Sequence, residues 1–347
     1  MPMEPGDHVR RYNKLEGETS TWKEHWRQVA DVILPRKSDF NTTRTPGDKR
    51  HTQLYDSTGA HAAELLAAAL HGMLTNPASE WFTLRAIDPA LAEDKETKAW
   101  LSEVERRMFG ALNSPVSGFS SHMHELYLDL VTFGTSAMFL GENVNTDGLL
   151  FDTRSLDEIV IAENADGVVD TVYRKFKWNI RKVAQRFGEE NMSSKTQEFL
   201  KNKEYDKNIE ILHCVYPRTD ADKKRADRSN LPIASQYLEV EGEHILEDGG
   251  FDEMPYMVPR WSKAVGETWG RSVGMTVLPD VNMLQEMQKT LIRAAQKQVD
   301  PPLLVNDDGV IGPVRTVPGG LNFVRSESGA IQPLLTGGSI PIGLEIM

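Results

Sequence analysis

The sequence predicts an α+β chain in which helices fill residues 1–135, mixed β structure fills residues 136–265, and a long helix leads into a small β module. Apolar residues recur every three to four positions in the first part, which is the period of helices with one buried face. The middle part has runs rich in β-branched and aromatic side chains, which are typical of strands. The double proline Pro301–Pro302 marks the end of the long helix, and the 47 residues that start there hold six Pro and eight Gly. We therefore divide the chain into residues 1–265, 266–300, 301–338 and 339–347.

The first predicted helix begins at Thr21–Glu24, a capping box whose side chains satisfy backbone N–H groups at a helix start. Pro35 follows its end. Its expected buried face comprises Trp22, Trp26, Val29 and Ile33. Residues 36–51 then hold five cations against two anions without an apolar period, which predicts a solvated surface loop. The alternative for this loop is a contact with a neighbouring subunit or with DNA.

Three further helices complete the helical part. Asp56 or Ser57 is predicted to cap the second helix, and Asn76–Pro77 ends it. Its apolar face is rich in alanine, which lets helices approach closely, so we expect this helix at the centre of its domain. That face comprises Ala62, Leu65, Leu66, Ala69, Leu70 and Met73. The third and fourth helices are predicted at residues 89–112 and 119–133, with a short strand or extended anchor at residues 81–84 between the second and the third.

The β-rich part alternates strands with short turns. Asn164–Gly167 has the residues of a hairpin turn, and Glu241–Glu243 is predicted to form a second one. Asn179 is predicted to cap a short helix over residues 180–187, and another helix is expected near residues 195–202. A charged, mobile loop is predicted at 218–230. The predicted strands are residues 137–140, 149–151, 158–163, 168–178, 209–216, 236–241, 244–247, 303–305, 314–317 and 321–324.

One long helix organises the C-terminal part. Its strongest periodic stretch is predicted to begin at Asp280, because the helix dipole favours a carboxylate in the first turn. A helix of about 24 residues spans roughly 36 Å, which is too long for a small domain to cover. We therefore expect it to line something or to pack against copies of itself. Its apolar stripe comprises Leu278, Val281, Leu284, Met287, Leu291, Ile292, Ala295 and Val299.

Cations form a second stripe on this helix. Lys289, Arg293 and Lys297 recur every fourth residue and therefore share a face. Between residues 285 and 299 three cations stand against one anion, although the chain as a whole carries a net charge of −12. A solvated face is the simpler interpretation. The sharper interpretation is a surface that faces phosphate or an acidic neighbouring subunit.

No enzyme class is indicated by the motifs. The balance of 39 cations and 51 anions argues against a protein that grips nucleic acid over its whole surface, but it leaves room for a local basic strip. Gly266–Ser272 only faintly resembles a phosphate-binding loop, because three residues rather than four separate its glycines and Arg271 replaces the lysine. We expect a turn there instead. No Ser/His/Asp set can be chosen from the spacing.

Metals, cofactors and disulfides are not predicted either. Cys214 is the single cysteine, and on a strand it should be a small buried residue facing away from His213. His122 and His124 lie too far apart around a helix to share a metal ion, and Asp307–Gly309 is expected to be a turn rather than a cation site. The longest apolar run is far shorter than the about 20 residues of a membrane span.

A series of short motifs resembles the head-to-tail connecting (portal) proteins of short-tailed bacteriophages. Each motif is weak alone, but together they follow the family order over most of the chain. They are Ile33–Arg36, Tyr55–Gly59, Leu74–Pro77 before Trp81–Phe82, Phe133–Thr135, Gly266–Ser272, Leu278–Asp280, Asp300–Leu304 and Pro318–Gly320. Two residues depart from the pattern, Trp269 where a tyrosine is expected and Val273 where a proline is expected.

The resemblance implies a wing domain at residues 1–265, a stem helix at 266–300, a clip at 301–338 and the start of a second stem helix at 339–347. In this family the rest of that helix, a channel loop and a crown follow, so we expect the sequence to be an N-terminal fragment or the ordered part of a longer protein. Stem helices of neighbouring copies would bury Leu284, Leu291 and Ala295 between them. The candidates for contacts with DNA or with the next subunit are Lys289, Arg293, Lys297, Arg315 and Arg325.

The function implied by the resemblance is a structural ring of twelve copies at one capsid vertex, through which double-stranded DNA enters and leaves. The implied partners are the large terminase subunit, tail adaptor or head-completion proteins, the major capsid protein and the scaffold, without a cofactor or a membrane. The ring would be assembled in the host cytoplasm and kept in the virion. Two alternatives are a tail adaptor that binds such a ring and a DNA-packaging nuclease or ATPase, which would need clustered acidic residues or a phosphate loop.

Overall fold

The structure is a computed structural model that describes residues 3–40, 54–143, 148–219, 221, 227–306, 315–324 and 332–334. The chain divides into two compact units, one made of residues 1–50 and 59–277 and the other of residues 51–58 and 278–347. Helices and mainly antiparallel sheets make up both units together, so the predicted α+β class is confirmed. Within the described ranges, no helix is long and apolar enough to cross a bilayer.

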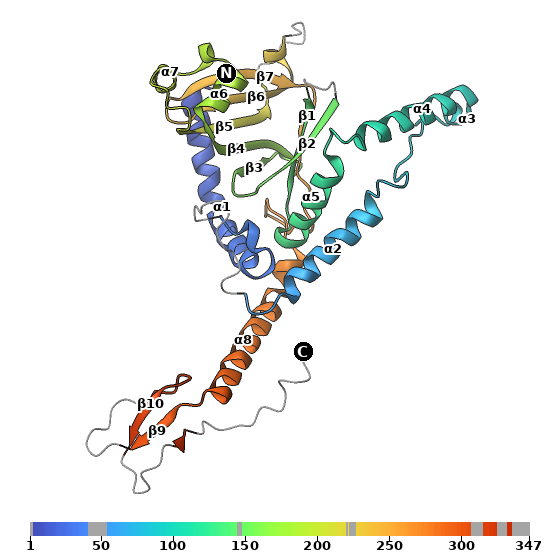
Figure 1. Cartoon of the computed structure of the whole chain (residues 1–347). Coiled ribbons are helices and arrows are strands. Elements are labelled where there is room, and N and C mark those ends of the chain that lie inside the picture. The colour runs from blue at the N-terminus through green and yellow to red at the C-terminus, as the bar shows by residue number, and fades with distance from the viewer. Residues whose placement is uncertain are drawn as a thin grey trace. The chain divides into compact units, whose positions relative to one another are not determined.

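A five-stranded antiparallel sheet forms the core of the first unit (Figure 1), with strand order β3-β4-β5-β6-β7. Its strands are β3 (Ile159–Glu163), β4 (Val169–Asn179), β5 (Asn208–Pro217), β6 (Ile233–Glu239) and β7 (His244–Phe251). The sequence predicted all five, with ends displaced by a few residues. The predicted turn between β3 and β4 is confirmed, since the Asn164 N–H donates to the Val168 carbonyl at 2.9 Å and Gly167 has a φ of 75°, a backbone region that favours glycine.

Helix α1 (Pro5–Ile33) covers one face of this sheet. Tyr12 packs there in a cluster with Tyr173, and His8 Nδ1 lies 3.1 Å from the Tyr173 hydroxyl. The prediction that the helix begins at Thr21 is wrong, because that residue lies inside the helix. Burial of His8 and Tyr12 against the sheet stabilises the N-terminal half, and proline is well suited to the first helical position.

Two short helices, α6 (Ile180–Phe187) and α7 (Ser194–Lys201), pack near the opposite face of the sheet. The predicted cap of α6 is confirmed, since Asn179 accepts a hydrogen bond from the Lys182 N–H at 3.0 Å. Side chains alternate between the two faces of a strand. The buried Cys214 therefore lies in the α1-facing cluster and His213 points the other way, as predicted.

A smaller sheet with strand order β2-β1-β8 lies beside α5 in the same unit. It consists of β1 (Ala137–Asn143), β2 (Gly148–Arg154) and β8 (Tyr256–Met257). Helix α5 (Phe119–Phe133) has the predicted bounds, and Gly134 ends it with a φ of 80°.

The predicted solvated loop after α1 is wrong for residues 37–40, although Arg36 is exposed. Pro35–Lys37 forms a 3-10 turn, η1, and Ser38 and Phe40 are buried. The Lys37 ammonium lies 2.7 Å from Asp129 in α5. Residues 41–51 of the predicted loop lie outside the described residues. Of the loop predicted at 218–230, residues 220 and 222–226 lie outside them too, and Arg228–Asn230 forms a 3-10 turn, η3.

Residues 58–118, here called the arm, hold α2 (Thr58–Leu74), α3 (Pro89–Glu93) and α4 (Lys95–Leu112). The third predicted helix is thus two helices, because Asp94 accepts a hydrogen bond from the Thr97 N–H at 2.8 Å and starts a new one. Trp81 and Phe82 form no strand but lie against Phe109 of α4, with the Phe82 and Phe109 rings 4.3 Å apart.

The prediction that α2 lies at the centre of its domain is wrong. Only Ala63 and Ala67 of α2 are buried, whereas Leu65 is 64% exposed and Met73 is 83% exposed. Whether a helix face is buried depends on which other segment packs against it, and the periodicity of one helix does not reveal that segment.

The second unit combines most of α8 (Val273–Val299) with residues 54–58 and a small sheet of order β10-β9-β11. Strand β9 (Leu303–Asn306) pairs in parallel with β10 (Leu321–Val324) and antiparallel with β11 (Gln332–Pro333). Two of the three strands predicted here are confirmed, and the described part of the third, residues 315–317, is not a strand. Residues 307–309 and 339–347, for which a turn and a helix start were predicted, lie outside the described residues.

Candidate functional site: the long helix and its anchorage

Helix α8 begins at Val273, before Asp280, where its strongest periodic stretch was predicted to begin, and it contains Pro279. Ser272 explains the earlier start. Its hydroxyl accepts a hydrogen bond from the Met275 N–H at 2.8 Å and donates one to the Thr132 carbonyl at 2.7 Å. The first bond satisfies one of the free N–H groups at the helix start, and the second ties that start to α5.

The segment before α8 crosses the end of α5 at very close range. A Cβ atom at Gly134 or at Gly270 would overlap the carbonyl oxygen of the other residue. The Gly270 N–H donates to the Thr135 hydroxyl at 2.8 Å, and the Trp261 N–H donates to the Gly134 carbonyl at 2.8 Å. Only glycine fits at both positions, because no side chain stands between the two backbones.

Two tryptophans from distant parts of the chain cover this crossing. Trp26 of α1 is fully buried, and its ring lies edge-on to Trp269 with the centroids 4.8 Å apart. The Trp26 indole N–H donates to the Phe133 carbonyl at 3.2 Å, so the buried polar atom has a partner. Trp269, which departs from the family pattern, is therefore part of the packing.

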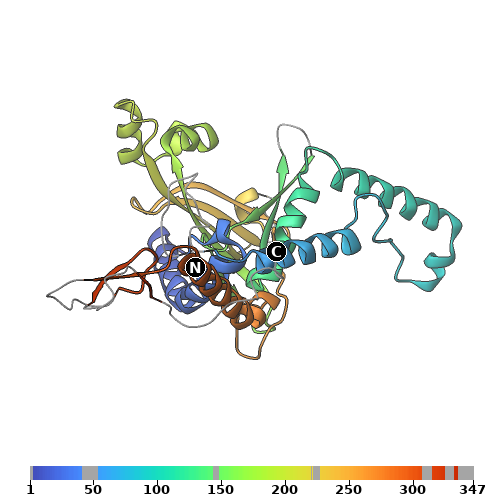
Figure 2. The same ribbon diagram turned by 60° about the horizontal axis from the view of Figure 1, so that its bottom comes forward.

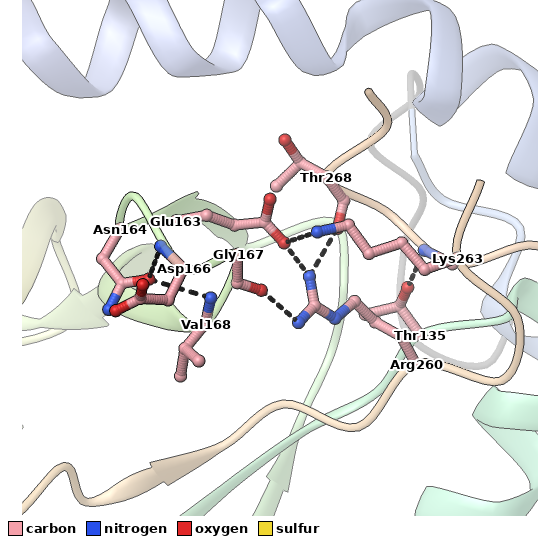
Figure 3. A network of polar contacts seen from close by, with 10 residues as sticks. Thr135, Glu163, Asn164, Asp166, Gly167, Val168, Arg260, Lys263 and Thr268 are labelled. Atoms are coloured by element: carbon pink, nitrogen blue, oxygen red, sulfur yellow. Dashed lines mark hydrogen bonds and ion pairs between the residues drawn. The ribbon is translucent and has the colours of Figure 1, made fainter. Parts of the chain in front are cut away.

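An ion-pair network ties the same segment to the β3–β4 turn (Figure 3). Arg260 pairs with Glu163, donates to the Gly167 carbonyl at 3.1 Å and donates to the Thr268 carbonyl at 3.2 Å. Lys263 donates to Glu163 at 2.6 Å. Burial alone would raise the pKa of Glu163, but the hydrogen bonds from Lys263 and Arg260 lower it. We call residues 260–272 the anchorage, since they fix the first turn of α8 to the sheet and to α5.

The anchorage uses its own backbone N–H groups. Those of Glu267, Gly270 and Arg271 donate to Ala264, Thr135 and Ser262, and Arg271 pairs with Glu267. A phosphate loop needs N–H groups that point at the ligand. Residues 266–272 therefore have the role predicted for them, a turn before the long helix.

Beyond the anchorage, α8 carries apolar side chains on several sides. Val281 is buried, the proposed packing residues Leu284 and Leu291 are half-buried, and Ala295 is exposed. Four larger apolar side chains of the same stretch are also exposed: Met283, Met287, Ile292 and Val299. A helix with exposed apolar residues on several sides favours contacts with other chains.

A contact between α8 and the segment before α2 was not predicted from the sequence. Gln285 is buried, and its Oε1 accepts hydrogen bonds from the N–H groups of Tyr55 and Asp56 at 2.8 and 3.0 Å. Its Nε2 donates to the Asp56 carbonyl at 2.5 Å. One signal was available, since Gln285 is a polar residue next to Val281 and Ile292 on the apolar side of the helix.

The three stripe cations occupy different surroundings. Lys289 pairs with Glu286 at 2.7 Å, and its ammonium lies 5.8 Å from the centroid of the Tyr55 ring. Arg293 is exposed and Lys297 is half-buried. One continuous helix carries Lys289, Arg293 and Lys297 at four-residue spacing, so the three cations do share a face. Its contact with phosphate or with an acidic neighbouring subunit stays a prediction.

Arg315 and Arg325, in the β module, are the other two candidates for contacts with DNA or with the next subunit. Arg315 is exposed, and its backbone N–H and carbonyl bond the side chain of the buried Asn322. Arg325 lies outside the described residues.

His122 and His213 have structural roles. His122 accepts a hydrogen bond from the Thr153 N–H at 3.1 Å. His213 stacks on Tyr237 at 4.0 Å and lies 3.2 Å from the Tyr256 hydroxyl, and burial lowers its pKa well below the ordinary value. No group of three or more His, Cys, Asp or Glu residues in the described ranges is arranged to hold a metal ion.

Comparisons with known proteins agree on one family. Residues 7–340 match the family described as "Bacteriophage head to tail connecting protein". The chain is 30% identical over 320 residues to the "Probable portal protein" of Bordetella phage BPP-1. This match covers 91% of this chain and 57% of that protein. It is also 30% identical over 325 residues to the "Portal protein" of Salmonella phage epsilon15, and this second match covers 92% of this chain and 58% of that protein. The chain thus spans little more than half the length of these relatives. Since the family match takes in both the anchorage and α8, the chain belongs to the bacteriophage head to tail connecting proteins.

Proposed function

We propose that this chain is the portal, or head-to-tail connector, subunit of a phage capsid. Copies assemble into a closed ring, by resemblance of twelve, at one capsid vertex. Double-stranded DNA passes through the ring during packaging and ejection. In this assignment residues 1–265 form the wing, 266–300 the stem helix, 301–338 the clip and 339–347 the start of a second stem helix.

One observation carries the proposal beyond family membership, namely the apolar side chains left exposed on α8. A soluble chain gains little from exposing Met283, Met287 and Ile292 on one long helix. A cyclic, head-to-tail arrangement gives each helix two neighbours and so can cover two sides of it. Leu284, Leu291 and Ala295 are the residues that we propose to lie between neighbouring stems.

The cations Lys289, Arg293 and Lys297 are proposed to face either the DNA backbone or acidic groups of the next subunit. Arg315 and Arg325 are further candidates. A channel that passes any DNA sequence must not read bases, and phosphate contacts screened by salt hold the strand only weakly. The net charge of −12 supports such weak contacts, because the rest of the chain repels DNA.

The proposed partners are the large terminase subunit, tail adaptor or head-completion proteins, the major capsid protein and the scaffold. The ring would be assembled in the host cytoplasm and remain at the portal vertex of the virion. A tail adaptor is the second candidate. The order of long helix, β module and following segment, together with the relatives' printed names, favours the ring itself over an adaptor or an ATP-dependent packaging enzyme.

Mass photometry and negative-stain electron microscopy of the purified protein test the proposal. We expect closed rings of many copies, and we expect Leu291→Glu together with Ala295→Glu to shift the population towards smaller species. Lys201→Glu, at the C-terminal end of α7, is the control for an added acidic side chain and should leave the rings intact. A protein that stays monomeric at every concentration would refute the proposal.

A further inference from the structure

The arm has an apolar helix face that no described residue of its own unit covers. Ala62, Leu65, Ala69 and Met73 of α2 are all exposed, and their spacing of three or four residues places them on one side of the helix. The buried side of α2 is different, since its buried residues are Ala63 and Ala67. We call the four exposed residues the α2 face.

A second uncovered face lies on α4. Trp100, Met108 and Ala111 are exposed and Val104 is half-buried, and the four recur at three- or four-residue spacing. Trp100 is 64% exposed. Phe109 lies on the opposite, buried side of α4, where Trp81 and Phe82 cover it. We call these four residues the α4 face.

The two faces are both free of charged residues and differ in the size of their side chains. The α2 face presents two alanines, which allow close approach, and the α4 face presents the bulky side chains of Trp100 and Met108. Helix α2 carries one acidic residue, Glu64, and no lysine or arginine, whereas α4 carries four cations and three anions. Because α2 has no lysine or arginine, its apolar face is unsuited to the phosphate backbone of nucleic acid and suits an apolar protein surface instead.

Both faces are exposed on the same chain, so they do not cover each other within it. Figures 1 and 2 show α2 and α4 as separate rods on the same side of the first unit, joined by residues 75–94. Helix α2 runs away from the sheets and α4 runs back towards α5. An interface between identical chains that repeats around a ring joins two different surfaces of each chain, and the arm has two such surfaces.

We propose that the α2 face of one copy packs against the α4 face of the next copy. This inference rests on the proposed ring but concerns the arm, not α8. Because the helices run in opposite directions along the arm, Ala62 of one copy should lie near Ala111 of the next, and Met73 near Trp100.

Cysteine cross-linking between two different variants tests the pairing. Ala62→Cys and Ala111→Cys proteins, carrying different tags, are mixed in equal amounts and oxidised, and disulfide-linked dimers are identified by mass spectrometry. We expect dimers that contain one copy of each variant. The natural Cys214 is buried, so the unchanged protein gives the background. Glu64→Cys mixed with Ala111→Cys is the matched control, because Glu64 lies off the α2 face, and it should give at least tenfold less product.

A second variant measures what the contact contributes to assembly. Leu65→Asp with Met73→Asp changes two side chains that are exposed in the single chain, so the melting temperature of the monomer should stay the same while assembly falls at least tenfold. Absence of mixed dimers above the control level, or normal assembly of this double variant, overturns the inference. Rings without mixed dimers would leave the proposed function standing. Mixed dimers without rings would support the contact between the α2 and α4 faces and would contradict the proposed function.

Discussion

Lys37 lies in a run of cations, yet it is a buried partner of two carboxylates. Its ammonium lies 2.7 Å from Asp129 and 2.8 Å from Glu125, and its side chain is 15% exposed while that of Asp129 is 1% exposed. Burial raises the pKa of Asp129 from 3.8 to about 6, despite the attraction of Lys37. Because this pKa is raised in the folded state, the stability gained from protonated Asp129 is full below about pH 4 and is lost as the pH rises through about 6.

Replacing the cation should therefore have a pH-dependent cost. At pH 8, Lys37→Met leaves the buried Asp129 without the cation that lowers its pKa, so the carboxyl must either stay charged in the interior or take up a proton at high pH. Either cost should lower the free energy of unfolding by about 3–5 kcal/mol. At pH 5 Asp129 can take up a proton, so the loss should be smaller. Urea unfolding at both pH values measures the difference, with Lys207→Met at a solvent-exposed ion pair as the control. Equal losses at pH 5 and pH 8 would contradict this description of the pair.

Glycines at the crossing of α5 and the anchorage give a second test at single residues. Gly134→Ala should destabilise the protein by about 1–3 kcal/mol from its left-handed backbone alone, and overlap with Gly270 adds to that. Gly270→Ala should also destabilise it. Gly17, inside α1, has no atom within 4 Å of an added Cβ, so Gly17→Ala should instead stabilise by about 0.5–1 kcal/mol. Thermal unfolding of the three variants measures the order, and similar melting temperatures would show that the close approach is absent.

The Lys37–Asp129 pair and the Gly134–Gly270 crossing were not predicted, because each joins residues that lie far apart in the sequence. Nothing near Lys37 identifies Asp129 as its partner, and the local pattern gave a solvated loop. The glycine motif at 266–272 was correctly taken as a turn, but its contact with Gly134 depends on the path of another helix. Local patterns identify the residue types that a backbone requires, whereas pairing between distant segments is a property of the folded chain.

Among the secondary-structure elements, those with a local start or end signal were predicted best. The cap at Asn179 and the left-handed Gly134 fix α6 and α5 at their predicted ends. The start of α1 was missed, because burial of its N-terminal half outweighs the capping box at Thr21. The prediction that α2 is central was wrong for a related reason, since most of its alanine-rich face is not covered by the described part of the chain. The periodicity of a helix identifies an apolar face but not the partner that covers it.

Gln285 allows a test of how α8 is held to residues 54–58. Gln285→Leu keeps the size of the side chain but removes three hydrogen bonds with Tyr55 and Asp56. Unpaired buried amide groups cost about 1–3 kcal/mol, so amide hydrogen exchange in residues 54–58 should become roughly 10-fold to 100-fold faster. Gln296→Leu, exposed on the same helix, is the control and should leave that exchange unchanged. Unaltered protection in Gln285→Leu would mean that these bonds do not hold the segment.

For the molecule as a whole, the proposed assembly depends on apolar side chains that are exposed in the single chain. Helix α8 and the arm both expose large apolar side chains, whereas the five-stranded sheet is buried on both faces. The buried sheet is expected to stabilise the single chain, and the exposed helices would supply the contacts of the proposed assembly. In the proposed ring, α8 packs around the channel and the arm joins neighbouring copies.

A cryo-electron microscopy reconstruction of the purified assembly tests the central claim most directly, because it places α8 relative to its copies. The account predicts a closed ring in which successive α8 helices stand side by side around a central hole, with Leu291 and Ala295 between neighbours. A ring with α8 on its outer rim, or particles without a central hole, would contradict it.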